Sequence, residues 1–278
     1  MSYRKDLGHK LTQLVDKLLL FPQDIDRLLA TAVKPTGDNK EIMRLINNNP
    51  ELWTDLLHSA ATYYGMAEDN ETVEDIVRRI GAQPLVQLIG VSYARKAIEE
   101  EFASLKYLNE YFDHSGNISL GCRILAEVSD MPQNQCQMYT VAGLMHDIGR
   151  LAIMVASNRT SAHVLGTLWD KMASVIYDEK TLLGTDHCDV GMQICRKWKF
   201  SQIIQEGILR HHTPLIDNNF NLPGAIIFIA HFLSASDPSG EIISTLSSAE
   251  ILANMKLTLD DFDKARRIYK SRIRNGVS

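Results

Sequence analysis

Apolar residues recur at helical spacing along the whole of this chain. The first stripe consists of Leu7, Leu11, Leu14 and Leu18. This spacing places the four leucines on one face of an amphipathic helix, because an α-helix turns once in about 3.6 residues. No apolar segment has a partner segment with the two-residue alternation of sheet strands. The pattern predicts an all-α, multi-helical protein.

Turn residues and capping motifs divide the first part of the chain into short helices. Pro22 ends the first helix, and the sequence Asn-Asn-Asn-Pro at 47–50 separates two later ones. Thr72 followed by Asp75 is similar to a capping box at the start of a helix. Pro84 is expected in the first turn of a mostly apolar helix that continues to Ala97.

A further series of helices is predicted in the second part of the chain. They are expected at 104–112, 115–128, 135–156, 161–183, 186–198, 201–211, 223–235, 246–254 and 259–273. The apolar runs 151–156 and 224–230 could in isolation be buried strands. Both extend into helical stripes and neither has a partner run, so we interpret them as buried helices.

The length and composition fit one compact body. The chain has 278 residues, of which 45% are hydrophobic and 23% charged, as in an ordinary globular protein. We expect an N-terminal helical part at 1–103 and a second helical part at 104–278 that carries most of the histidines. No glycine- or serine-rich linker separates them, so the two parts should pack together as one continuous module.

The charge and hydropathy restrict the partners. A net charge of −5 gives no general attraction to nucleic acid or to an acidic membrane surface. No window approaches the roughly 18 uncharged apolar residues that cross a bilayer, and no apolar leader is present. We expect a cytoplasmic protein with no nucleic-acid or membrane partner. The acidic start and basic end of the last helix suit the helix dipole and favour a solvated helix end, with phosphate or acidic-partner binding as the alternative.

The cysteines are Cys122, Cys136, Cys188 and Cys195. Their spacing does not match a metal-binding motif, and no secretory leader takes them to an oxidising compartment. The last two are seven residues apart and therefore share one face of a helix. The simplest interpretation is that they are small core residues.

A histidine–aspartate pair interrupts an apolar segment near the middle of the chain. His146 and Asp147 follow Ala-Gly-Leu-Met and precede Ile-Gly-Arg-Leu. On one helix neighbouring side chains diverge by about 100°, so both could reach one ion only if it lay near their shared edge. An imidazole and a carboxylate together suit a divalent transition metal. Gly149 leaves room for a close approach of another backbone.

Two further histidines lie in apolar surroundings. His114 is expected to begin a helix, and His231 lies in an otherwise apolar one. A buried imidazole without a partner costs about 1–3 kcal/mol. Taken singly, each is more simply a hydrogen-bonded core histidine. Taken with His146 and Asp147, a metal cluster explains them equally well.

The other histidines divide into two groups. His187 shares a predicted helix face with apolar residues and is most simply a residue at the edge of the core. His211 and His212 end a helix, where a cationic side chain is favoured. All three could instead contact a phosphate or a second ion. The histidines that we interpret as structural are His9, His58 and His163.

The segment Gly-Leu-Met-His-Asp-Ile-Gly-Arg-Leu at 143–151 resembles the central motif of the HD superfamily of metal-dependent phosphohydrolases. A longer ordered pattern resembles the HDOD (HD-related output domain) family. Its elements are Leu20-Phe-Pro, Ile46-Asn-Asn-Asn-Pro-Glu-Leu, Leu57-His-Ser-Ala-Ala-Thr-Tyr-Tyr-Gly, Val73-Glu-Asp-Ile-Val-Arg-Arg-Ile-Gly, Tyr111-Phe-Asp-His-Ser, Asp186-His-Cys-Asp-Val-Gly with Trp198, and His211-His-Thr-Pro. Their order and spacing hold over about residues 18–235, which is more specific than a lone His-Asp dipeptide.

The resemblance implies an all-α HD fold and a role in bacterial signalling, where such modules stand alone or are joined to receiver or nucleotide-cyclase-like domains. In catalytic HD proteins a histidine, the His-Asp pair and a later aspartate hold the ion. These ligands map onto His114, His146, Asp147 and position 231, where His231 replaces the aspartate. The less anionic site disfavours Mg²⁺ and Mn²⁺ relative to Fe, Zn or Ni.

The resemblance also bounds the chemistry. The expected cofactor is a divalent transition metal (Fe, Zn, Ni or Mn), or none, because HDOD members are regarded as degenerate and have no established activity. The Gly-Tyr-Pro signature of the cyclic-dinucleotide phosphodiesterases is absent from the sequence. Cyclic-dinucleotide hydrolysis is therefore not expected.

Two main functional hypotheses remain. The first is a signal-transduction module that uses a degenerate HD metal site to bind a signalling protein or a small phosphorylated ligand. The second is a metal-dependent phosphohydrolase acting on a nucleotide or another phosphoester, in which the bound ion activates water. A weaker third hypothesis is a metal or redox sensor.

Overall fold

The computed structural model describes residues 2–18, 21–32, 39–48, 72–103, 108–156, 175–234 and 246–274, with the isolated positions 50, 53, 54, 57 and 105. The elements are α1 (Ser2–Lys17), α2 (Gln23–Ala32), α3 (Asn39–Asn47), α5 (Val73–Ile80), α6 (Ala82–Glu101), α7 (Leu108–Val128), α8 (Gln133–Met145), α9 (Ile148–Ala156), α11 (Val175–Leu183), α12 (His187–Lys197), α13 (Gln202–Arg210), β1 (Leu215–Ile216), β2 (Asn219–Phe220), α14 (Leu222–Ser234), α15 (Leu246–Asn254) and α16 (Leu259–Arg274). Within these ranges one two-stranded hairpin is the sole sheet, so the all-α prediction is confirmed.

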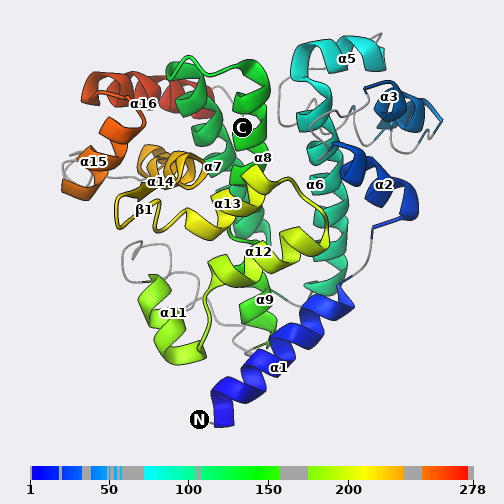
Figure 1. Ribbon diagram of the computed structural model, residues 1–278, viewed down its shortest axis with the longest axis vertical. Coiled ribbons are helices and arrows are strands. Elements are labelled where there is room, and N and C mark those ends of the chain that lie inside the picture. Colours follow the sequence, from blue (N-terminus) through cyan, green and yellow to red (C-terminus); the bar gives the residue numbers. More distant parts are fainter. Residues whose placement is uncertain are drawn as a thin grey trace.

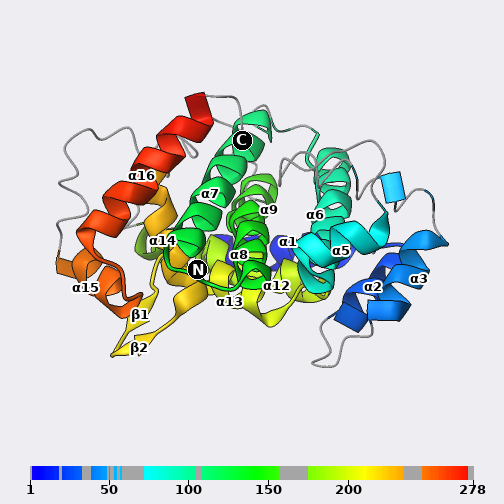
Figure 2. The same cartoon turned by 90° about the horizontal axis from the view of Figure 1, so that it is seen from above.

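Helices α6, α7 and α8 form the middle of the molecule (Figure 1). Helix α8 packs against α6, α7, α13 and α14. Seen from above, α2, α3 and α5 lie at one end of the molecule and α15 and α16 at the other (Figure 2). Helix α1 packs against α9, α11 and α12. The result is a helical body in which α8 is surrounded on several sides.

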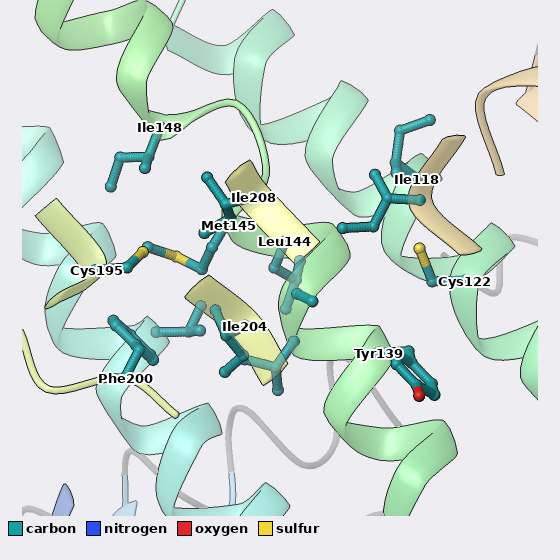
Figure 3. Packing of buried hydrophobic residues seen from close by; sticks show 14 of the residues in the cluster. Ile118, Cys122, Tyr139, Leu144, Met145, Ile148, Cys195, Phe200, Ile204 and Ile208 are labelled. Atoms are coloured by element: carbon teal, nitrogen blue, oxygen red, sulfur yellow. The ribbon is translucent and has the colours of Figure 1, made fainter. Parts of the chain in front are cut away.

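The hydrophobic core is centred on α8 and its neighbours. Figure 3 shows part of it, with Leu144 and Met145 of α8, Ile204 and Ile208 of α13, and Cys195 of α12 in one cluster of buried residues. Burying one large apolar side chain of this kind stabilises a fold by about 1.5–3 kcal/mol. This core fixes the helix ends that carry the polar residues of the candidate site.

The helix starts predicted for the first part of the chain are confirmed where the structure describes them. Thr72 caps α5: its hydroxyl accepts from the backbone N–H of Asp75, whose carboxylate accepts from the backbone N–H of Thr72, both at 3.2 Å. Pro84 lies in the first turn of α6. Leu7, Leu11 and Leu18 are buried on one side of the N-terminal segment. The helix expected after Pro50 falls mostly outside the described residues.

The predicted helix 135–156 is wrong in one respect, because the chain breaks at His146–Asp147. Helix α8 ends at Met145 and α9 begins at Ile148. The break allows Gly149 to lie against the backbone of α12, where an added Cβ would be 2.0 Å from the carbonyl oxygen of His187. At this point Nε2 of His146 and Oδ2 of Asp147 lie 3.2 Å apart, near the shared edge of the two side chains.

The predicted separation of helices 104–112 and 115–128 is also wrong. Helix α7 is continuous from Leu108 to Val128, so His114 lies within a helix rather than at its start. The buried face passes through the Ser-Gly step without interruption, with Tyr111, Ser115 and Ile118 on one side. Packing of that face outweighs the weak helix propensity of serine and glycine.

The remaining described elements match the expected positions closely, with one addition, the hairpin formed by β1 and β2. Both apolar runs that could have been strands are helical, in α9 and α14. Of the helix expected at 161–183, residues 175–183 are helical and 157–174 lie outside the described part of the chain. The unpredicted hairpin turns at Asp217 and Asn218, whose φ angles are 48° and 63°. Aspartate and asparagine tolerate this left-handed backbone.

Candidate metal centre

The break between α8 and α9 places His146 and Asp147 at a point where four other helices meet. The side chains gathered there are His114 from α7, His187 and Cys188 from α12, His211 and His212 from the end of α13, and His231 from α14. All seven residues that the sequence singled out as metal, phosphate or second-ion contacts therefore lie in one cluster.

The first group of ligands surrounds one oxygen of Asp147. Oδ2 lies 3.2 Å from Nε2 of His146 and 3.7 Å from Nε2 of His114. These two ring nitrogens are 3.3 Å apart. The ring of His231 completes the group, with its centroid 5.0 Å from that of His146 and 5.4 Å from that of His114.

The second group faces the other oxygen of the same carboxylate. Oδ1 lies 3.3 Å from Nε2 of His187 and 3.5 Å from Nε2 of His211. The two ring nitrogens are 3.3 Å apart. Asp147 thus lies between the two groups, with one oxygen directed to each.

The outer ring nitrogens show which inner nitrogens carry a lone pair. Nδ1 donates to a backbone carbonyl in His146 (Gly143, 2.8 Å), His211 (Ile208, 2.7 Å) and His231 (Ile227, 2.9 Å). A carbonyl oxygen only accepts, so each Nδ1 must hold a proton. In a neutral imidazole Nε2 is then an acceptor, the form in which histidine binds metals.

His187 has the same orientation, fixed by a carboxylate. Its Nδ1 donates to Oε2 of Glu179 at 2.6 Å, and its backbone N–H donates to the same oxygen at 2.8 Å. Glu179 is a buried residue of α11. Such carboxylate–histidine pairs orient a ligand ring and increase its basicity in metal sites.

The environment of Asp147 fits a bound cation. Both of its oxygens are buried and neither accepts a hydrogen bond of good geometry. Around Oδ1, three potential ligand atoms lie 3.3–3.5 Å from one another: Oδ1 itself and Nε2 of His187 and His211. Two nitrogen ligands of one tetrahedral ion lie about 3.3 Å apart when the metal–nitrogen bonds are about 2.0–2.1 Å. The cluster of histidine, cysteine and aspartate therefore fits a metal site.

Arg150 adds a positive charge to the buried side of the centre. Its Nε lies 3.1 Å from Oδ1 of Asp147, and its Nη2 lies 3.3 Å from Nε2 of His212. Burial raises the pKa of Asp147, but Arg150 and His146 outweigh that effect and hold the pKa well below its usual value of 3.8. The carboxylate is therefore charged at neutral pH and available as a ligand.

Three imidazoles of the centre, His211, His212 and His231, are held in the neutral form. Burial, together with the neighbouring histidines, lowers the pKa of His211 from 6.5 to about 4. Burial and the nearby His211 lower the pKa of His212 well below its ordinary value. Loss of contact with water and the nearby His146 have the same effect on the pKa of His231. A neutral ring is the form that a metal ion requires.

The metal-free protein should lose stability as the pH falls from about 6.5 to about 4. In this window the unfolded chain protonates its histidines while His211, with a pKa of about 4, remains neutral in the fold. At about 1.4 kcal/mol for each pKa unit, His211 alone lowers the free energy of unfolding by about 3 kcal/mol. Urea unfolding of chelator-treated protein at several pH values measures this. Replacing the exposed His9 with glutamine is the control, and a midpoint that stays constant across the window would contradict the expectation.

The two groups differ in their exposure to solvent. The side chain of His114 is 18% exposed, and His231 is also partly exposed. By contrast, the side chains of Asp147, His187 and His211 are fully buried. The first group is therefore the one nearer to solvent, on the side of α7 and α14.

Glu179 is a residue of the centre that the sequence did not indicate. Replacing it with glutamine should weaken metal binding about 10- to 100-fold, because the amide no longer holds the ring of His187 with a charged acceptor. Competition with a chelator of known affinity measures this loss. Asp178→Asn, at the exposed neighbouring position of α11, is the matched control and should retain wild-type affinity. Equal affinities for Glu179→Gln and wild type would show that the pair has no such role.

An all-helical body with a buried His-Asp pair at a helix break and further histidines around it defines the class of HD-type proteins. The sequence profile of the HDOD domain matches residues 18–214. The chain belongs to the HDOD family.

Solved structures share the fold. The protein described as "Putative phosphohydrolase" from Shewanella amazonensis is 22% identical with a TM-score of 0.70, covering 95% of this chain and 94% of that one. An HDOD domain protein of unknown function from Geobacter sulfurreducens is 20% identical with a TM-score of 0.68, covering 99% and 95%. A "Putative signal transduction protein" from Marinobacter aquaeolei is 17% identical with a TM-score of 0.64, covering 97% of this chain and 64% of that one. At these identities the likeness concerns the fold.

Two other comparisons give negative findings. No curated protein matches the chain in sequence. Among the described residues, no helix combines the length and the apolar character that a membrane span requires.

Proposed function

We propose that this chain is a signalling module that binds a small phosphorylated ligand or a partner protein at a divalent metal centre around Asp147. The observation that supports the metal is the set of facing ligand atoms: Oδ1 of Asp147 and Nε2 of His187 and His211 lie 3.3–3.5 Å apart, as the ligands of one ion would. Arg150, whose Nε lies 3.1 Å from Oδ1, offsets part of the charge of the carboxylate but does not lie between the two ring nitrogens. The signalling role rests on membership of the HDOD family.

The residues divide into two ligand sets that share Asp147. The first ion would be held by His114, His146, His231 and Oδ2 of Asp147. The second would be held by His187, His211 and Oδ1. Because His231 stands where catalytic relatives are expected to have aspartate, the first set has a single negative charge. This composition favours Fe, Zn or Ni over Mg²⁺.

The first ion is the one that a ligand would reach. His114 forms the partly exposed edge of the first set, whereas the second set is closed. Phosphate oxygens are ligands that a divalent ion accepts in an open coordination position. A phosphorylated ligand would therefore bind on the side of α7 and α14.

A second candidate function is phosphoester hydrolysis. The exposed edge at His114 favours it, because catalytic metal sites keep one position open to water or substrate. When bound, a divalent ion there supplies a water of lowered pKa and polarises a phosphoryl oxygen. The chain's own contribution would be to hold the ligand rings in the neutral form and to limit the approach of water to one side.

Metal analysis and ligand binding together test these functions. Protein purified without chelator is measured for metal, beside His146→Ala, and is then titrated with inorganic phosphate and a nucleotide panel while its thermal unfolding and any phosphate release are followed. Metal-dependent stabilisation without turnover supports the binding module. Metal-dependent phosphate release that His146→Ala abolishes establishes the hydrolase instead. Protein that binds no divalent ion rules out both metal-dependent functions.

A further inference from the structure

The second ligand set is incomplete with three members. Asp147, His187 and His211 supply three atoms at mutual distances of 3.3–3.5 Å. A buried zinc-type site uses four ligands in a tetrahedron, and no position in a closed site is left for solvent. A closed site of this kind would need a fourth side chain within reach of these three atoms.

Two further side chains, Cys188 and His212, lie beside this set, and they differ in the contacts that their ligand atoms already make. The ligand atoms of His187, Cys188, His211 and His212 all lie within 4.8 Å of one another. Nε2 of His212 is directed to Arg150, a side chain that only donates hydrogen bonds. Cys188 lies beside the inner nitrogen of His187: its Sγ is 3.7 Å from Nε2 of His187, and 3.6 Å from Nδ1 of His211, the outer nitrogen that donates to the carbonyl of Ile208.

We propose that Cys188 is the fourth ligand of the second ion, so that this set is a closed, thiophilic site of the zinc type. The proposal rests on the proposed metal centre and adds a ligand and an ion class to it. In a tetrahedron with a metal–sulfur bond of about 2.3 Å, sulfur and nitrogen lie about 3.6 Å apart. The 3.7 Å between Sγ of Cys188 and Nε2 of His187 agrees with this separation.

Cys188 differs from the other cysteines in its surroundings. Cys122 and Cys195 belong to the apolar core cluster, and the thiol of Cys136 donates to the carbonyl of Met131. Cys188 is buried but lies outside that cluster, among imidazoles. Burial, reinforced by the charge of Asp186, raises the pKa of the Cys188 thiol well above its usual value in the absence of an ion. A coordinated metal deprotonates a thiol outright, so the buried position is compatible with a ligand role.

The ligand type and the burial together indicate what the ion does. A thiolate with two imidazoles selects Zn²⁺, Co²⁺ or Cd²⁺ over Mg²⁺ and Mn²⁺. Four protein ligands leave no position for a substrate, as in structural zinc sites. The second ion would join α12 and the end of α13 to the His-Asp break, while the first ion remains open to ligands.

Cobalt substitution tests the proposal. Metal-free protein is loaded with Co²⁺, and we expect two ions per chain with a sulfur-to-cobalt charge-transfer absorption in the near ultraviolet. Cys188→Ser should lose that absorption and bind the second ion at least about 100-fold more weakly. Replacing a residue that only supports a ligand already weakens metal binding about 10- to 100-fold, so loss of a ligand should cost at least as much. Cys195→Ala is the matched control, since Cys195 is a buried residue of the same helix within the apolar core. It should retain both ions and the absorption.

Zinc X-ray absorption of the unaltered protein provides a second measurement that does not depend on how a variant folds. One sulfur neighbour at about 2.3 Å supports the proposal, whereas a shell of nitrogen and oxygen alone overturns it. If ions bind but sulfur is absent from both measurements, the Cys188 assignment is wrong and the metal centre stands. If no ion binds, both are wrong.

Discussion

Replacing Asp147 with asparagine should remove both ions at once. The two carboxylate oxygens face different ligand sets, Oδ2 toward His146 and Oδ1 toward His187. An asparagine of the same shape offers one oxygen and no charge, and its amide nitrogen would direct hydrogens at the ring nitrogens. We expect each ion to bind at least about 100-fold more weakly, beyond the loss that follows from removing an outer-shell partner.

The metal content of different variants distinguishes an aspartate that binds both ions from a residue that binds only one. Metal content measured on protein exchanged into metal-free buffer should fall to a small fraction of wild type in Asp147→Asn, whereas His187→Ala should lose the second ion alone. Asp189→Asn is the control, because its carboxylate lies in the first turn of α12 and is partly exposed. Retention of one full ion by Asp147→Asn would show that the carboxylate does not link the two sets.

The helices were predictable because their pattern is local. The leucine stripe of α1, the capping box of Thr72 and the burial of α9 each depend on residues within a few turns of one another. The break at His146 was not predictable in this way. No proline or turn sequence marks it, and the close approach of Gly149 that accompanies it is to the backbone of α12, which is distant in sequence.

The histidines of the site were predictable for a different reason. An imidazole in an apolar helix such as that of His231 needs a partner, and several such positions together indicate a cluster. Glu179 gave no comparable indication, because a glutamate in a helix usually faces solvent. Only the packing of α11 beside α12 brings it to His187. Cys188 was interpreted as a core residue, although its position next to His187 and two residues after the helix cap Asp186 could have placed it at the site.

Replacing Gly149 with alanine should destabilise the fold severely. An added Cβ would lie 2.0 Å from the carbonyl oxygen of His187 and 2.6 Å from the backbone nitrogen of Gly191. Both neighbours are backbone atoms, so no side-chain rotation relieves the overlap, and α9 must move away from α12. Overpacking of a core typically costs about 1–3 kcal/mol of stability, and we expect this overlap of backbone atoms to cost at least the upper value. We expect the free energy of unfolding to fall by at least about 3 kcal/mol in urea.

The same substitution at Gly116 is the matched control, because an added Cβ there meets no atom within 4 Å. Gly116 lies inside α7, where exchanging glycine for alanine should stabilise the helix by about 0.5–1 kcal/mol. If the free energy of unfolding falls in Gly149→Ala and rises in Gly116→Ala, contact with α12 rather than the loss of glycine itself determines the effect. Because the overlap involves His187, Gly149→Ala should also weaken binding of the second ion under conditions where the variant is still folded. A Gly149→Ala protein as stable as wild type would contradict the close crossing of α9 and α12 on which the geometry of the centre depends.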